Sequence, residues 1–347
     1  MTTGRHCTSP RISETQLQFM NSLLGQPVFS VGNQKYCWDD VILSAQLRGD
    51  WADLEKELGE GIACLKQLDE AAEEIDPEEL EAAANDFRYE RDLVTAEEAE
   101  AWLNRWNLGA DSWMEYIQRF MLRRKWADQL AEIVARYRVT KKEIHSSLHA
   151  EGICSGHLAR FARALAARAS AYEKALEAGW IRDERESAEA AGKIRLLEAG
   201  YQSFCDHVVD SQGIKHQVKS HRLDWIRFEC RYVLFSEEQM AHEAALCVRD
   251  DGMQLDEVAK NANIALQNAA IYLDEVEPSL RDRFLSAKKG ALIGPLDWDK
   301  AFGLFLVEDK IIPAVEDPKI KQRAQGTLLQ SAVNREIDNR VKWHARL

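Results

Sequence analysis

Histidine and cysteine side chains gather in one short segment, HSSLHAEGICSGH, which spans residues 145–157. His145 and His149 are four residues apart, so on a helix they would share one face, as metal ligands can. No Glu follows the first of these histidines, so the HExxH motif of zinc proteases is absent. With Cys154 and His157 close by, the alternatives are a metal site and a polar helix end, and we predict the helix end without a metal.

A second candidate pair, Cys205 and His207, does not suit nucleophilic catalysis. Residues two apart on a helix point to different faces, so the imidazole could not activate the thiol. The sequence also lacks GxSxG, the P-loop motif GxxxxGK[ST], and a GxGxxG that follows a strand. We therefore expect no cofactor.

Charge and composition exclude further classes of function. The formal net charge of -13 disfavours nucleic acid as a partner, because phosphate binding relies on Lys and Arg. The 7 cysteines are scattered without a CxxC pair, which disfavours a disulfide framework. No stretch reaches about 18 apolar residues and the N-terminus lacks an apolar signal sequence, so we expect a cytoplasmic protein without membrane insertion.

The pattern of residues predicts an α+β protein that is predominantly helical. In 347 residues there are 7 prolines and 18 glycines, which favours long helices. Residues 28–38 read as a hairpin, and Asp39 or Asp40 can cap the helix that follows. Further helix starts are indicated by Asp76 before a proline and by capping boxes at Thr95 and Thr140.

The hydrophobic pattern changes near Trp225, where helical periodicity is followed by short runs that are typical of strands. The elements expected after Thr140 are helices over 155–178 and 182–209, a strand RFECRYVLF, a helix capped by Ser236 and ending at Val248, a short helix over 255–261, strands over 269–273 and 303–312 with a helix over 277–288 between them, and a terminal helix from Asp317 to Trp343.

The order of these late elements, together with several local strings, resembles the parvulin (PpiC-type) family of peptidyl-prolyl isomerases. GMQLDEVAKNAN and VEPSLRDRFLSAKKGALIGPL are similar to two segments of that domain, with Pro278, Gly290 and Pro295 in register. FGLFLVEDKII is similar to the closing strand of the domain. The resemblance covers about 120 residues and implies a small sheet flanked by helices.

The helical sequence from Glu73 to Leu130 resembles the region that precedes the parvulin domain in SurA-type chaperones. The resemblance implies a helical chaperone-like module plus a degenerate parvulin-like domain. The expected segments are an N-terminal arm over 1–27, a SurA-like helical region over 28–139, a helical insertion over 140–222, a parvulin-like domain over 223–313 and a C-terminal helix over 314–347.

The resemblance also assigns positions to the isomerase site. The two histidines of the family fall on Tyr232 and Phe305, the pocket methionine and phenylalanine on Val276 and Leu280, and a serine on Asn263. Apolar character is kept at the proline pocket, while the histidine pair is lost. The true catalytic residues, if any, are therefore unknown.

Peptide binding does not require the lost histidine pair, so it is the role that we consider for these residues. Val276, Leu280 and Phe305 either line a peptide groove or simply form core, and Tyr232 either faces the groove or is a buried hydroxyl. Trp102 and Trp106, four residues apart, form an aromatic ridge that is either core or a cradle for peptide. The acidic run over 69–92 is either a solvated helix face or a docking surface for a basic peptide.

We therefore expect a foldase-like, peptide-binding chaperone or accessory protein that holds a precursor or unfolded peptide for maturation or export. Its parvulin-like site is expected to be inactive. The alternatives are an active peptidyl-prolyl cis-trans isomerase, a scaffold subunit of a peptide-modifying enzyme complex, and a metal-dependent enzyme in the middle helices. A peptide-modifying enzyme or an exporter is a further possible partner.

Overall fold

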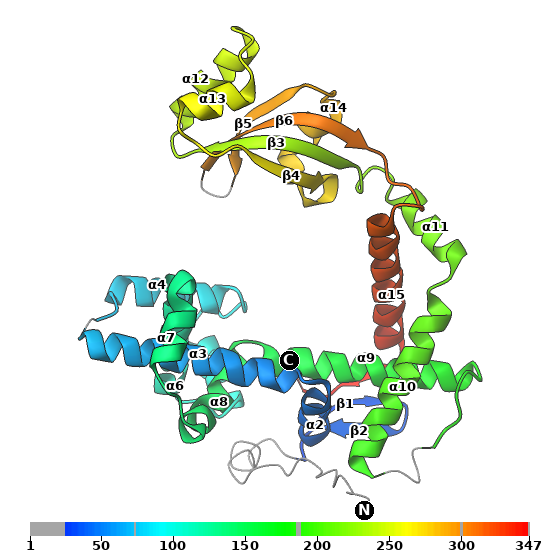
Figure 1. The fold of residues 1–347 in the computed structure, drawn as a ribbon. Helices are drawn as coiled ribbons and strands as arrows, with labels where there is room; N and C mark the ends of the chain where they lie inside the picture. Colours follow the sequence, from blue (N-terminus) through cyan, green and yellow to red (C-terminus); the bar gives the residue numbers. More distant parts are fainter. Residues whose placement is uncertain (1–24, 73, 185–188, 299–300, 346–347) are drawn as a thin grey trace, which may run out of the picture. The chain divides into compact units, whose positions relative to one another are not determined.

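The computed structural model describes residues 25–72, 74–184, 189–298 and 301–345. The chain is α+β and predominantly helical, as expected, and divides into two compact units (Figure 1). Unit 1 holds residues 1–204 and 333–347, and unit 2 holds residues 205–332. Among the described residues, no helix combines the length and apolar character that crossing a bilayer requires.

Unit 1 is a helical body with a three-stranded sheet. Its strands are β1 (Pro27–Val31), β2 (Gln34–Cys37) and β7 (Val341–Trp343). Its helices are α2 (Trp38–Arg48), α3 (Asp50–Ala71), α4 (Pro77–Tyr89), α5 (Ala96–Arg105), α6 (Ala110–Lys125), α7 (Leu130–Arg136), α8 (Lys141–Cys154), α9 (His157–Glu177) and most of α10 (Ala190–Val208), with a 3-10 turn at Ala127–Gln129 before α7.

The helix starts predicted at Asp76, Thr95 and Thr140 are confirmed, whereas the cap predicted at Asp39 or Asp40 is wrong, because α2 begins at Trp38 with Cys37 as its N-cap. Asp76 accepts a hydrogen bond from the Glu78 backbone, with Pro77 at the first helical position. Thr95 and Thr140 each form a reciprocal capping box with the Glu three residues later. These bonds satisfy backbone N–H groups that have no partner within the first turn of a helix.

Other boundaries differ from the prediction. The helix expected over 182–209 begins at Ala190, and Ser236 does not cap α12, whose N-terminal cap is Glu237 without a side-chain bond. The expected helix from Val41 onward is interrupted at Gly49, whose φ of +92° is a left-handed conformation that glycine adopts without strain. Residues 1–24 of the arm predicted for 1–27 lie outside the described residues. Pro27 already belongs to β1.

The C-terminal helix predicted for 314–347 requires a correction. Helix α15 (Pro318–Arg340) ends before β7, which pairs antiparallel with β1. Trp343 packs on Phe29 with ring centroids 5.5 Å apart, and Arg340 donates two hydrogen bonds to Glu177 of α9. The sequence favours helix here because a three-residue strand has no local signal, and only the distant β1 supplies its partner.

Helices from both sides of the predicted boundary at residue 140 share one core in unit 1. This core contains Leu54 of α3, Ile117 of α6, Leu148 of α8 and Leu165 of α9. The described part of the segment 140–222 contains helices α8, α9, α10 and α11 (Ser211–Ser220), and the first of these pack with the N-terminal helices. That this segment is an insertion stays a prediction.

Unit 2 contains a four-stranded antiparallel sheet in the order β4-β3-β6-β5. Its strands are β3 (Arg227–Phe235), β4 (Gln267–Tyr272), β5 (Leu292–Trp298) and β6 (Ala301–Ile311). Its helices are α11 (Ser211–Ser220), α12 (Glu238–Arg249), α13 (Leu255–Asn261), α14 (Arg281–Ser286) and the first part of α15, with 3-10 turns at Leu273–Glu275 and Pro278–Leu280.

The sequence missed one strand of this sheet, β5. Gly294 and Pro295 stand in its middle and read as a turn, yet β5 is an edge strand with an irregular register between Ile293 and Leu296. An edge strand with a bulge tolerates proline, because one backbone side needs no ladder partner. The single helix expected over 277–288 is instead the short turn at Pro278–Leu280 followed by α14.

A close approach between α3 and α6 positions the helices of unit 1. Gly61 of α3 lies against Arg119 of α6, and a methyl group at Gly61 would lie 2.8 Å from the Arg119 Cβ. At Gly59, two residues earlier, the nearest atom would be the Ile144 Cδ1 at an ordinary 3.5 Å. Gly61 therefore allows a helix contact that any larger residue would push apart.

We predict that Gly61→Ala destabilises the protein by about 1–3 kcal/mol, because the added methyl group overpacks this contact. Gly59→Ala is the matched control in the same helix, and alanine there should be neutral or stabilising by up to about 1 kcal/mol. Urea unfolding followed by circular dichroism measures both. Equal effects of the two substitutions would show that the α3–α6 contact is not tight.

Candidate functional site

Tyr232 and Phe305 lie opposite each other on β3 and β6 of unit 2. Their rings stack with centroids 5.3 Å apart and an angle of 15° between the planes. The Tyr232 hydroxyl donates a hydrogen bond to the Gln267 side chain on β4. Where the family resemblance expects two hydrogen-bonded histidines, the sheet thus carries a stacked aromatic pair.

Two further assigned positions, Val276 and Leu280, join this pair in one apolar cluster on the same face of the sheet. Trp298 of β5 and Phe284 of α14 pack against Phe305, with ring centroids at 4.8 Å and 6.1 Å. Val276 and Phe305 are 1% and 0% exposed. They are therefore core residues here, while Tyr232 and Leu280 are half-buried.

Asn263, the fifth assigned position, is not part of this cluster. It is exposed after the end of α13, with a φ of +55°. Its neighbours Ala262 and Ile264 pack in the cluster between α12, α13 and the other face of the sheet. The structure brings together four of the five assigned positions, and their catalytic and peptide-binding roles stay predictions.

The cluster around Phe305 offers little proton chemistry. Its one thiol, Cys230, is buried, and burial raises the pKa of this group to about 12, so it is neutral at physiological pH. The cluster also contains the Tyr232 hydroxyl, which donates to Gln267. This arrangement can hold apolar groups, and it places two aromatic rings where the resemblance expects two histidines.

Trp102 and Trp106 of unit 1 line an open groove of about 740 Å³, which we call the tryptophan groove. Trp102 is half-buried and meets Phe87 edge-on at 5.6 Å between ring centroids. Trp106 is 9% exposed and packs against Trp38 at 6.0 Å. The rest of the apolar lining consists of Leu93, Ala101, Ile153, Leu158 and Ala159. The ridge expected from the sequence thus borders a surface groove.

A second groove of about 660 Å³ lies between α4 and α6, and we call it the α4–α6 groove. Phe120 is 40% exposed at this groove, and Phe87 and Tyr116 lie beneath it. Glu90 and Arg91 line both grooves, so the two adjoin. No local sequence pattern indicates this groove, because only the packing of α4 on α6 brings the acidic run beside Phe120.

An ion pair is buried beneath these aromatic side chains. Arg119 of α6 donates from Nε to Glu151 of α8 at 3.2 Å, and the two side chains are 1% and 3% exposed. Burial raises the pKa of Glu151, while the Arg119 charge acts in the opposite direction. Sequence reasoning missed this pair, since the partners are 32 residues apart.

The histidine and cysteine segment over 145–157 does not form a metal site among the described residues. Cys154 is buried, and burial raises the pKa of its thiol to about 12. His157 is buried and lies beside Ser155, with 2.6 Å between Nδ1 and Oγ. Cys205 and His207 lie two apart on α10, a spacing that places them on different faces.

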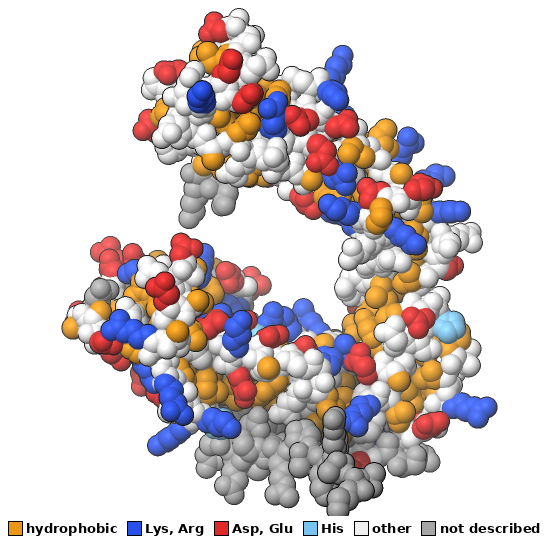
Figure 2. Space-filling model, viewed as in Figure 1, with side chains coloured by type: hydrophobic (Ala, Val, Ile, Leu, Met, Phe, Trp, Pro, Cys, Tyr) orange, Lys and Arg blue, Asp and Glu red, His pale blue; other side chains and the backbone are white. Residues whose placement is uncertain are grey.

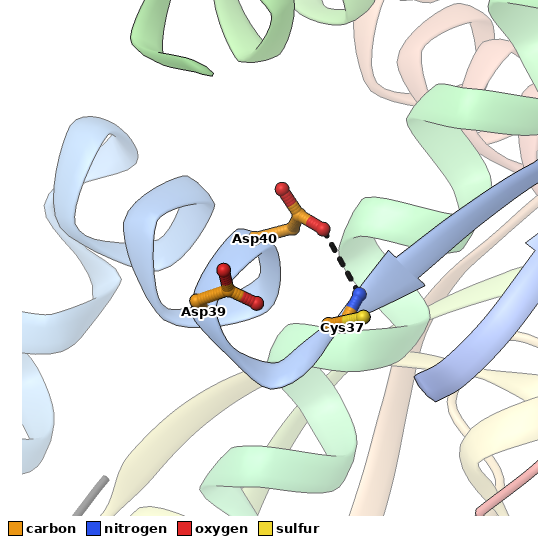
Figure 3. Close-up of side chains that lie close together, drawn as sticks. All are labelled: Cys37, Asp39 and Asp40. Atoms are coloured by element: carbon orange, nitrogen blue, oxygen red, sulfur yellow. Dashed lines mark hydrogen bonds between the residues drawn. The ribbon is translucent and has the colours of Figure 1, made fainter. Parts of the chain in front are cut away.

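A different group, Cys37, Asp39 and Asp40, places three ligand-type atoms within 4.8 Å of one another. Figure 3 shows Asp40 reaching back to the Cys37 backbone N–H, which donates to its carboxylate at 2.9 Å. This bond caps the start of α2. Burial raises the pKa of Asp40, which further disfavours the charged form that a metal needs. The group is therefore explained by helix capping.

Comparison with known proteins finds a likeness among solved structures alone. No protein-family model and no curated protein matches the sequence. Among solved structures, the chain is similar to a structure described with the SurA-like chaperones PEB4 and Cj1289 of Campylobacter jejuni, at 10% identity and a TM-score of 0.21. The match covers 93% of this chain and 100% of the other. At that TM-score the likeness carries no argument about function.

A histidine with a lowered pKa, His149, is hydrogen-bonded to one residue of the tryptophan groove. The ring of His149 hydrogen-bonds the backbone of Trp106, and burial lowers the pKa of His149 below its ordinary value of 6.5. The unfolded chain therefore takes up a proton at higher pH than the folded one does. It follows that stability contributed by neutral His149 is present above about pH 6.5 and is lost on further acidification.

We predict that His149→Asn makes stability less dependent on pH between about pH 7 and 5, because Asn keeps an N–H but does not titrate. Urea unfolding at several pH values measures the slope for both proteins. Burial also lowers the pKa of His157. Because His157 is present in both proteins, the difference between their slopes reports His149 alone. Parallel slopes would contradict the prediction.

Proposed function

We propose that this protein is a foldase-like chaperone or accessory protein that holds an unfolded or precursor peptide. The observation that carries the proposal is the pair of adjoining grooves on unit 1, where Phe120 is exposed and Trp102 is half-buried. Apolar grooves with a few aromatic anchors are a common way to bind peptide side chains. An unfolded chain exposes such side chains, while a folded one buries them.

The size of the grooves suits weak, reversible binding. Burial of one Leu or Phe side chain contributes about 1.5–3 kcal/mol. Two anchors, one in each groove, would contribute about 3–6 kcal/mol before the cost of ordering the peptide, which corresponds to a dissociation constant from roughly tens of micromolar to several millimolar. Such affinity allows a client to leave and fold, as a chaperone requires.

Unit 2 supports the second part of the proposal, an inactive parvulin-like domain. Its element order and antiparallel sheet agree with the parvulin resemblance of the sequence. Its assigned site holds Tyr232 and Phe305 in place of two histidines. We propose that this unit holds peptide at the half-buried surface near Leu280 without turning over X-Pro bonds.

We predict no acceleration of cis-trans isomerisation of a standard Xaa-Pro tetrapeptide. The uncatalysed barrier is about 18–20 kcal/mol, and Tyr232 and Phe305 occupy the positions where the resemblance places the two histidines, so that hydrogen-bonded pair is missing from the assigned site. A protease-coupled or NMR exchange assay measures the rate. Turnover at ordinary parvulin rates that is lost in a folded Leu280→Ala variant would establish the rival, an active isomerase.

We predict that Trp102→Ala weakens binding of a reduced, unfolded client such as carboxymethylated lactalbumin by about tenfold, since it removes an aromatic wall of the tryptophan groove. Tyr89→Ala is the matched control, because Tyr89 is an aromatic residue of α4 that is 62% exposed and lines neither groove. Fluorescence anisotropy and suppression of client aggregation are the measurements. Equal loss in both variants would count against the groove.

Partner and location are finer parts of the same proposal. A peptide-modifying enzyme or an exporter would receive the held peptide, and affinity purification of the intact protein tests for either one. A cytoplasmic location agrees with the absence of a disulfide among the described cysteines. Cell fractionation tests the location. Stable association with an enzyme, without affinity for unfolded clients, would favour a scaffold subunit instead.

A further inference from the structure

The α4–α6 groove has an apolar floor and two charged rims of opposite sign. Glu79 and Asp86 of α4 line one side and are exposed, while Arg124 and Lys125 of α6 line the other side and are exposed. Phe120 lies between them on the groove surface. Figure 2 shows acidic side chains along the edge of unit 1 where α4 lies and basic ones farther along the same face.

The four charged side chains on the rims have no ion-pair partner among the described residues. Among the described residues, none of Glu79, Asp86, Arg124 and Lys125 forms an ion pair, although many other charged residues of unit 1 do. Arg124 instead lies over the Phe120 ring at 5.5 Å from its centroid. An apolar floor between two unpaired rims of opposite charge suits a partner with the complementary pattern.

We propose that the α4–α6 groove binds an amphipathic helix that presents Lys or Arg to α4. Glu79 and Asp86 are seven residues apart on one helix face, which places them about 10.5 Å apart along the axis. A partner helix lying along α4 would meet both with two cations that are also seven residues apart. Its apolar stripe would cover Phe120, and its opposite flank would face Arg124 and Lys125.

This inference rests on the proposed function and narrows the client to one class, cationic amphipathic segments. The α4 rim also explains part of the acidic run over 69–92, because Glu79 and Asp86 face the groove. Glu78 and Glu81 of the same helix are exposed but do not line it. The run therefore contains a docking face and a solvated face side by side.

Binding of three labelled helical peptides tests the inference. They share one apolar Leu/Phe stripe and differ at two flank positions seven residues apart, which hold Lys, Gln or Glu. We expect affinity to fall in that order, with about a five- to twentyfold difference between the Lys and Glu peptides at low salt, since each exposed ion pair changes the constant a few fold. The difference should shrink at about 0.5 M salt.

The double substitution Glu79→Lys with Asp86→Lys should reverse the order of the three peptides. Glu78→Lys with Glu81→Lys makes the same change of charge in the same helix and should leave the order unchanged, which excludes an effect of net charge. Phe120→Ala should weaken all three peptides. If the lysine double variant does not fold, Glu79→Gln with Asp86→Asn should abolish the preference.

Two results would overturn the inference while leaving the proposed function intact: equal affinity of the three peptides for the wild-type protein, or equal effects of the two lysine double variants. Failure of all three peptides, together with failure of the unfolded client, would overturn both the inference and the proposed function. Circular dichroism of each variant establishes that the fold is kept.

Discussion

The buried ion pair between Arg119 and Glu151 is the interaction on which the arrangement of unit 1 depends. It joins α6 to α8, and Gly61 of α3 makes room for the arginine side chain. Two charges are stable in a protein interior only when they are paired, and removing one partner of a buried pair typically costs about 3–5 kcal/mol. The pair therefore fixes the rotation of α6 about its axis.

That rotation decides which side chains α6 presents to solvent. With Arg119 turned inward, Tyr116 and Ile117 are buried, and Phe120 lies at the surface beside α4. A rotation that buried Phe120 would expose the arginine and leave Glu151 without its partner. Exposure of the Phe120 side chain is unfavourable by itself. It is maintained because the neighbouring Arg119 must stay buried to pair with Glu151.

Unit 2 differs, since the packing around Phe305 is mostly apolar and includes no buried ion pair among the members described above. Both faces of the sheet are covered, by α12 and α13 on one side and by α14 with Trp298 on the other. Phe305 and Val276 are consequently packed core residues. The stacked rings of Tyr232 and Phe305 join two neighbouring strands of this packed sheet, and no charged group of the described residues is buried between them.

The sequence alone determined the features that depend on neighbours in the chain. Capping by Asp76, Thr95 and Thr140 and the short helix Leu255–Asn261 follow from hydrogen bonds and periodicity within a few residues. The predominantly helical α+β class follows from the same signals. Four of the five positions assigned by resemblance also lie together, but this depends on the pairing of β3 with β6 and not on neighbours in the chain.

Tertiary structure decided everything that required a distant partner. Strand β7 exists because β1 offers it an edge, and β5 accepts Pro295 because it is itself an edge strand. The Arg119–Glu151 pair and the α4–α6 groove join residues from helices whose packing no local pattern specifies. Local sequence fixes where helices begin, whereas burial of charge and apolar surface across the whole unit fixes which faces meet.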